Sequence, residues 1–352
     1  MKIKRVDVLD YIKGISMSCI VLMHLLYTYG DSLPNIIRQS SLFLGTCSHI
    51  FIICSGFGLY YSFLNQPISY KDFYKKRLSN LYFPYIAIVL ITACIPIIYT
   101  DIDKVQAVLS HVFLYKMFMP VYEESLGGQL WFISTIIQFY FVFFILVKFQ
   151  NRYGNKHLMH GALLLSLYWS FIVITIGKAD SRVWNSFFLQ YLWEFVFGMV
   201  IANRYTYKRL HYKNYTNTRL LVLISFIGIG ILGITGITNS ILKQFNDIPG
   251  VLGVLALLIL IYKMCNEKIR IIFFKLGKVS YYWFLVHILV FEIMTYYLRG
   301  VLSDYLLLPF MYIISLVIGI LYYKLWTIIS KKISIKKNKP KHTYNELIYS
   351  EF

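Results

Sequence analysis

Long apolar runs set the strongest limit on what this chain of 352 residues can fold into. About ten of them are long enough to cross a bilayer, which takes about 20 residues in a helix. Inside hydrocarbon every backbone N–H and C=O must be bonded within the protein, so uninterrupted apolar runs of this length are helices. We therefore predict an all-α, polytopic integral membrane protein with about ten transmembrane helices. The predicted spans are residues 11–29, 42–63, 82–100, 130–148, 158–176, 185–203, 219–236, 248–263, 280–298 and 306–329.

The number and position of the charged residues support a membrane protein and predict on which side of the membrane its termini lie. Only 14% of the residues are charged, against about 25% in soluble domains. The net charge of +19 suggests nucleic acid as a partner, but the basic residues lie in short connections between apolar runs, so we exclude that reading. Most of the 35 Lys and Arg residues fall in alternate connections, which places both termini in the cytoplasm. We expect a transmembrane domain over residues 1–330 and a basic cytoplasmic tail over residues 331–352.

Two segments between the spans have their own pattern. Residues 70–84 are basic and amphipathic, and we predict a cytoplasmic helix there that ends where a new helix begins at Pro84. Residues 105–119 are apolar but interrupted by His111 and Lys116. We interpret them as an interfacial or re-entrant helix rather than a span.

The first apolar run carries Lys13 near its start and His24 deep inside. Eleven positions at 100° each return to within about 20° of the starting direction, so the two side chains share one face, about 16 Å apart along the axis. Asp10 falls close to the same face. Ionisable groups at such depth are rare and mark functional sites, so this face is predicted to point toward protein or water.

Other polar groups lie within later spans. Counting residues from the ends of the helices puts His49 at the same depth as His24. Glu194, His287 and Glu292 also lie in apolar surroundings and need partners inside the bundle. Structural hydrogen bonding is an alternative role for His49, His287 and Glu292. The five cysteines have no paired spacing, and no metal-ligand pattern is present, so we predict no metal site.

Several short motifs occur together in one order. The first helix reads Leu9-Asp10, then Lys13-Gly14, then His24. The later motifs are Ser55-Gly56-Phe57, Lys76-Arg77 before Pro84, Trp131 before Gln138-Phe139-Tyr140, Glu194-Phe195 before Gly198, and Ser280-Tyr281 before Leu285 and His287. With these motifs on such spans, the chain resembles the membrane-bound acyltransferase family 3, the polysaccharide O-acetylase group. It departs from the family pattern at Lys13 and Asn80, where the family has arginine.

The resemblance implies an enzyme of the bacterial inner (cytoplasmic) membrane. Such enzymes move an acetyl or other short acyl group from cytoplasmic acyl-coenzyme A to a hydroxyl of a cell-surface or lipid-linked polysaccharide. His24 would be catalytic, as general base or as nucleophile. The expected supporting residues are His49, His287, Glu292 and Glu194. The residues expected to bind coenzyme A are Lys13, Lys76, Arg77, Asp10, Ser280 and Tyr281, and those expected to bind the acceptor are Trp131 and Ser55. We expect no fused extracellular esterase-like domain, because only a tail follows residue 330.

Two other classes fit the same features. Buried histidines and a cationic mouth also suit an exporter of polysaccharide or anions. A non-catalytic membrane subunit of a polysaccharide synthase complex would need neither Lys13 nor His24. Turnover of a thioester distinguishes both from an acyltransferase.

Overall fold

The structure is a computed structural model and describes residues 7–207, 217–238 and 240–335. Within these residues it is helical, without a β-strand. The helices are α1 (Asp7–Thr28), α2 (Asn35–Ser41), η1 (Leu42–Thr46), α3 (Cys47–Asn65), α4 (Tyr70–Cys94), α5 (Lys104–Val112), η2 (Lys116–Phe118), η3 (Pro120–Tyr122), η4 (Gly128–Leu130), α6 (Trp131–Thr175), α7 (Arg182–Asn185), η5 (Phe188–Tyr191), α8 (Leu192–Tyr207), α10 (Thr218–Thr238), α11 (Ser240–Met264), α12 (Glu267–Leu298) and α13 (Asp304–Ile335).

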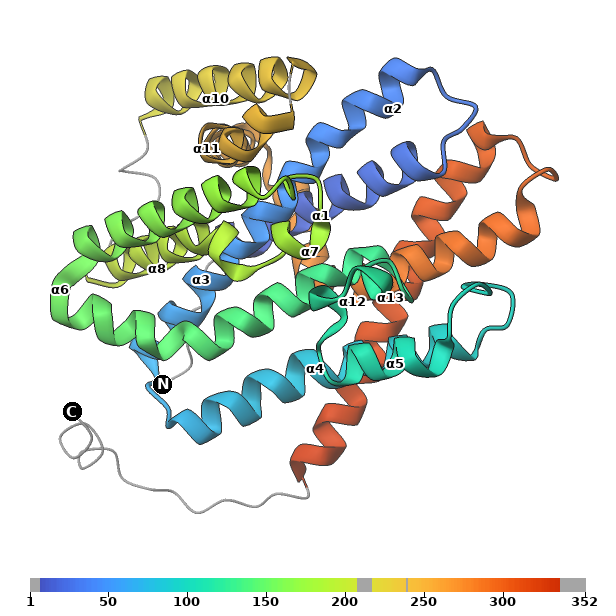
Figure 1. Cartoon of the computed structure of the whole chain (residues 1–352), viewed down its shortest axis with the longest axis horizontal. Coiled ribbons are helices and arrows are strands. Elements are labelled where there is room, and N and C mark those ends of the chain that lie inside the picture. The colour runs from blue at the N-terminus through green and yellow to red at the C-terminus, as the bar shows by residue number, and fades with distance from the viewer. Residues whose placement is uncertain (1–6, 208–216, 239, 336–352) are drawn as a thin grey trace.

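The predicted helical, membrane-spanning character is confirmed: 8 described helices are long and apolar enough to cross a membrane. One of them, α6, contains two of the predicted spans. At Gly154 its backbone leaves the helical region, with φ 79° and ψ 173°, and the two halves form a hairpin (Figure 1). The predicted sixth span is divided among α7, η5 and the 16-residue α8. The count of ten and the cytoplasmic position of the termini stay predictions.

The expected break at Pro84 is wrong. A single helix, α4, runs through it from Tyr70 to Cys94. Proline has no N–H for the preceding turn, but neighbouring helices supply donors to the α4 backbone. The hydroxyl of Tyr281 donates to the carbonyl of Leu81, and that of Tyr322 donates to the carbonyl of Pro84 at 2.6 Å. These two bonds tie α4 to α12 and α13 around Pro84.

The loop between α4 and α6 contains short helices, as predicted for residues 105–119, and it is firmly bound. Lys116 is buried and donates to the carbonyls of Ser125 at 2.9 Å and Gly127 at 3.2 Å. His111 donates from Nε2 to the Ser125 carbonyl at 2.9 Å and accepts from the Tyr85 hydroxyl at 2.7 Å. The loop is therefore tied to α4 rather than extended into solvent.

Glycines let the central helices touch through their backbones. A Cβ atom at Gly14 of α1 would lie 1.9 Å from the Phe273 carbonyl oxygen of α12, and one at Gly277 would lie 1.8 Å from the Asp10 oxygen. Gly56 of α3 and Gly198 of α8 make the same kind of contact with each other's helices. Close approach through small residues is a common way for membrane helices to associate.

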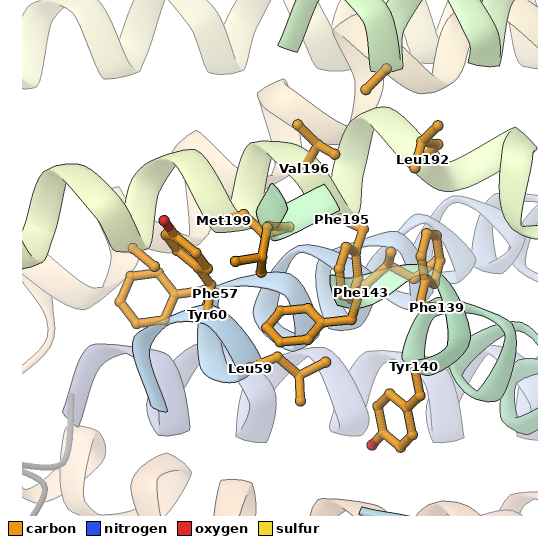
Figure 2. Close-up of a cluster of buried hydrophobic side chains, with 14 of the residues drawn as sticks. Phe57, Leu59, Tyr60, Phe139, Tyr140, Phe143, Leu192, Phe195, Val196 and Met199 are labelled. Atoms are coloured by element: carbon orange, nitrogen blue, oxygen red, sulfur yellow. The ribbon is translucent and has the colours of Figure 1, made fainter. Parts of the chain in front are cut away.

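An aromatic cluster joins α3, α6 and α8 (Figure 2). Phe139 and Phe195 stack with ring centroids 4.3 Å apart, and Phe143 stacks on Phe73 of α4 at 5.1 Å. All four rings are buried. Because aromatic pairs add to the stabilisation that burial gives, this cluster fixes the half of the bundle that carries α8.

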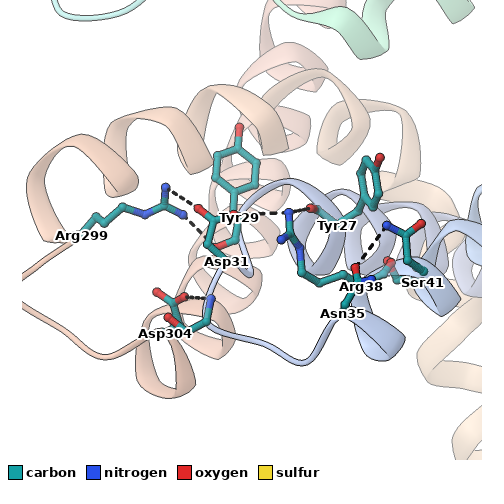
Figure 3. A network of polar contacts seen from close by, with 10 residues as sticks. Tyr27, Tyr29, Asp31, Asn35, Arg38, Ser41, Arg299 and Asp304 are labelled. Atoms are coloured by element: carbon teal, nitrogen blue, oxygen red, sulfur yellow. Dashed lines mark hydrogen bonds and ion pairs between the residues drawn. The ribbon is translucent and has the colours of Figure 1, made fainter.

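A polar network at the ends of α1 and α12 fixes the connections between helices (Figure 3). Asp31 pairs with Arg38 at 3.4 Å and with Arg299 at 3.1 Å. Asp304 accepts from the backbone N–H of Ser32 at 3.0 Å. These contacts hold the segment between α1 and α2 against the segment between α12 and α13.

Part of the charge pattern lies outside the described residues. This applies to residues 1–6 and 208–216 and to the predicted tail from residue 336 onward.

The glycine contact between α1 and α12 gives a first prediction. In Gly277→Ala the new methyl group meets backbone, which cannot move aside, so we expect a destabilisation of about 1–3 kcal/mol or more and a lower Tm in detergent. Gly58→Ala on α3 is the matched control, because nothing lies within 4 Å of its added Cβ. Equal Tm values for the two variants would contradict the packing described.

A second prediction concerns Lys116, which lies outside the candidate spans. Burial lowers the pKa of Lys116 to about 7, against the attraction of Glu124 and Glu123. An unfolded chain keeps its lysine pKa near 10.4, roughly. From about pH 7 to pH 10 the unfolded state therefore holds more protons, and the free energy of unfolding rises with pH. We expect the Tm to rise between these pH values more in the wild type than in Lys116→Met. An identical rise in both contradicts the assignment.

Candidate active site

A cavity of about 1350 Å³ lies among α1, α3, α4, α6 and α12. Both Lys13 and His24 line it, together with Met17 and Ile20 between them on the same face of α1. The shared face predicted for the first span is therefore the face that lines this cavity. At a rise of 1.5 Å per residue the two side chains start about 16 Å apart along the helix.

The end of the cavity at Lys13 is rich in cations. Arg77 of α4 and Lys278 of α12 line it together with Lys13. The Nε atom of Arg77 is buried and has no hydrogen-bond partner among the described residues. Three of the other residues expected to bind coenzyme A, Asp10, Ser280 and Tyr281, also line the cavity.

Lys76 was also expected beside Lys13, and the structure does not place it there. It is exposed and does not line the cavity, whereas its neighbour Arg77 does. One residue along a helix turns the side chain by 100°, so only one of the pair can point inward. Lys278 is the cation that the sequence analysis missed. It directly follows Gly277, which packs on α1, and that position next to the Ser280-Tyr281 motif was the available signal.

The His24 ring faces His287, with ring centroids 5.3 Å apart. His287 is fully buried, and its Nδ1 lies 2.8 Å from the Phe284 carbonyl and 3.3 Å from that of Trp283. A carbonyl only accepts, so Nδ1 carries the proton and Nε2 carries the lone pair. That Nε2 has no partner among the described residues. The Nε2 lone pair of His287 is thus available as a hydrogen-bond acceptor next to the His24 ring.

The relative alignment of α1 and α12 explains why the rings of His24 and His287 lie side by side. Gly14 packs at Gly277, and ten residues further along each helix His24 meets His287. Equal spacing means that the two helices run parallel at this contact. α3 and α8 also run parallel, because His49 bonds Glu194 and, further along both helices, Tyr60 bonds Asn203. Both relations agree with the alternation expected of the predicted spans.

His49 belongs to a second polar group in the wall of the cavity. Its Nδ1 lies 2.7 Å from Glu194 Oε1, and its Nε2 lies 3.8 Å from Asp247 Oδ1. Glu194 is fully buried, so His49 provides the partner that a carboxylate at this depth requires. His49 and Asp247 line the cavity, but Glu194 does not. Asp247 was not predicted, because it precedes the eighth apolar run rather than interrupting it.

The remaining candidates also lie at the cavity. Glu292 accepts from the Tyr29 hydroxyl at 2.7 Å. Of the residues expected to support His24, His49 and Glu292 contact other partners, and His287 lies beside it. The guanidinium of Arg182 lies 5.1 Å from the Trp131 ring centroid. Ser55 lines the cavity and donates to the Phe51 carbonyl at 2.8 Å.

The structure thus defines a helical membrane protein with an internal cavity that is lined by cations and by an imidazole. A family model described as "Acyltransferase domain" matches residues 6–324. The chain therefore belongs to acyltransferase family 3. No curated protein and no solved structure matches it.

Proposed function

We propose that this membrane acyltransferase moves an acetyl or other short acyl group from cytoplasmic acyl-coenzyme A to a hydroxyl of a cell-surface or lipid-linked polysaccharide. One observation carries the proposal: Lys13 and His24 line the same cavity. A phosphate-binding end and a base are thereby connected through the inside of the protein, along a single helix face.

The dimensions of the cavity suit the donor. A pantetheine arm has about 13 backbone atoms and extends about 15 Å, close to the roughly 16 Å between Lys13 and His24. In the proposal Lys13, Arg77 and Lys278 bind the phosphates, because cations make strong, short hydrogen bonds with phosphate oxygens. The thioester carbon then lies at His24.

At His24 a neutral imidazole takes the proton from the acceptor hydroxyl as the oxygen attacks the thioester carbon. The C–O bond forms, the C–S bond breaks, and the proton passes to the departing thiolate, which leaves as free thiol. His24 could instead take the acyl group first and pass it on to the acceptor hydroxyl. The overall reaction, from thioester and hydroxyl to ester and free thiol, is the same. His287 supports either route: its Nε2 can accept an N–H from His24 and orient the ring.

The acceptor would bind at the other end of the cavity, where Trp131, Arg182 and Asp247 line the wall. An aromatic ring, a guanidinium and a carboxylate together suit a sugar with several hydroxyl groups. Such a site needs few charges and several directed hydrogen bonds.

Removal of His24 is the third prediction. His24→Ala is expected to lower thiol release from acetyl-coenzyme A in the presence of acceptor glycan by about 10²–10⁴-fold. His160→Ala, at an exposed position of α6, is the matched control and should keep wild-type activity. Undiminished thiol release in His24→Ala, together with lost glycan flux across vesicles, would favour an exporter.

A fourth prediction compares two adjacent cations on α4. Arg77→Ala should raise KM for acetyl-coenzyme A about ten- to a hundredfold, since a hydrogen bond to a charged group contributes about 1.5–3 kcal/mol. Lys76→Ala should leave KM unchanged, because Lys76 points away from the cavity. Equal effects of the two variants, measured by steady-state thiol release, would contradict the assignment of the cationic end.

A further inference from the structure

The cavity contains a cation that the donor does not use. Four lysine and arginine side chains of the described residues line it, and three of them, Lys13, Arg77 and Lys278, belong to the cationic end. The fourth is Arg182 of α7. Of the charged side chains, Arg182 has the strongest electrostatic effect on the His24 ring. It therefore places a positive charge near the imidazole, away from the site proposed for the phosphates.

Two aromatic side chains orient the guanidinium of Arg182. Its central carbon lies 5.1 Å from the centroid of the Trp131 ring, and Trp131 stacks on Tyr191 with centroids 5.7 Å apart. The hydroxyl of Tyr191 also interacts with the guanidinium. A guanidinium that contacts a ring through its face keeps the N–H groups along its edge for a ligand.

The acidic side chains of this wall contact another partner. Glu194 and Asp247 lie 2.7 Å and 3.8 Å from the two nitrogens of His49. Within the part of the chain that the structure describes, Arg182 forms no ion pair. Its side chain is exposed, although it lines the cavity. A guanidinium is always charged in proteins, so this charge is available to an anionic ligand.

The segment that carries Arg182 is held in place by contacts with α6. The hydroxyl of Thr135 donates to the Ser186 carbonyl at 2.6 Å, and the indole of Trp169 donates to the Trp184 carbonyl at 3.2 Å. The rings of Trp169 and Trp184 also stack, with centroids 5.8 Å apart. Because the segment is fixed before a ligand arrives, little ordering is needed when the ligand binds.

A carboxylate is the ligand group that suits this guanidinium. The planar fork of an arginine donates two parallel hydrogen bonds to the two oxygens of one carboxylate. A neutral sugar offers hydroxyl groups but no charge to pair with Arg182. An acetyl group has no carboxylate either, so the saccharide has to supply it.

We infer that the acceptor is an acidic saccharide of the uronic acid type. Its carboxylate binds the guanidinium of Arg182, while a hydroxyl on the same or the adjoining sugar meets His24. The inference rests on the proposed acyl transfer and names the chemical class of its acceptor. Arg182 is then the residue that distinguishes acidic from neutral saccharides.

The test compares two acceptors that differ only in their carboxyl groups. Surface polysaccharide is isolated from host cells that lack the gene, and one portion is chemically reduced so that each carboxylate becomes a primary alcohol. Labelling by radioactive acetyl-coenzyme A is measured with the full-length protein in lipid nanodiscs. The wild type should label the native material about tenfold faster, or more, than the reduced material.

Arg182→Gln should remove this preference. It should label both materials at about the rate that the wild type shows with the reduced one, because the guanidinium and the carboxylate act as a pair. Lys178→Gln is the matched control, since Lys178 is an exposed cation of the same loop that does not line the cavity. This control should keep the wild-type preference. Equal binding of coenzyme A, measured by calorimetry, shows that the variants are folded.

The outcomes separate the inference from the proposed function. Equal labelling of native and reduced polysaccharide by the wild type overturns the acidic acceptor and leaves the acyltransferase intact. A preference that survives in Arg182→Gln, or an equal loss of rate with both materials, overturns the assignment of Arg182. Labelling of neither material by the wild type overturns the proposed function as well.

A second measurement locates the carboxylate, since an acyl group can also carry one. Succinyl-coenzyme A replaces acetyl-coenzyme A as the donor, with the reduced polysaccharide as the acceptor. The inference predicts that the wild type uses succinyl-coenzyme A no faster than acetyl-coenzyme A. A rate about tenfold higher or more with succinyl-coenzyme A, lost in Arg182→Gln, would place the carboxylate on the acyl group and overturn the acidic acceptor.

Discussion

The structure depends on one requirement: ionisable side chains at the depth of α1 must be enclosed by protein. Lys13 and His24 cannot face hydrocarbon without large cost, so other helices surround the face that carries them. The backbone contact between Gly14 and Gly277 brings α12 against α1. The parallel register that follows puts Lys278 near the level of Lys13 and His287 beside His24. This one glycine contact therefore positions residues of α12 at both ends of the site.

The rest of the bundle supports this pair of helices. α3 and α8 pack through Gly56 and Gly198 and bury the bond between His49 and Glu194. The aromatic cluster holds α6 against them. α4 contributes Arg77, and tyrosines of α12 and α13 donate to its carbonyls at Leu81 and Pro84, which fixes α4 against these two helices. The cavity is therefore bounded by helices that are each fixed by a specific contact.

Much of this could be predicted from the sequence, because spans and helix faces follow from periodicity. The length of the apolar runs, the shared face of Lys13 and His24 and the short helices of the loop after α4 all appear in the structure. Which side chains contact one another inside the bundle could not be predicted. His287 rather than His49 or Glu292 lies beside His24, and Arg77 rather than Lys76 points inward, because tertiary packing decides which side chains meet. The unbroken helix at Pro84 could not be predicted either, because local rules place a proline at a helix end, whereas α4 is bound there by hydroxyls 200 and 238 residues away in sequence.

The account's central claim is that coenzyme A extends through the bundle from Lys13 to His24. A cryo-electron microscopy structure with a thioether analogue of acetyl-coenzyme A would test it most directly. The account predicts phosphate density among Lys13, Arg77 and Lys278 and the acyl group against the His24 ring. Density for the analogue outside this cavity, or an acyl group far from His24 with the phosphates in place, would contradict it.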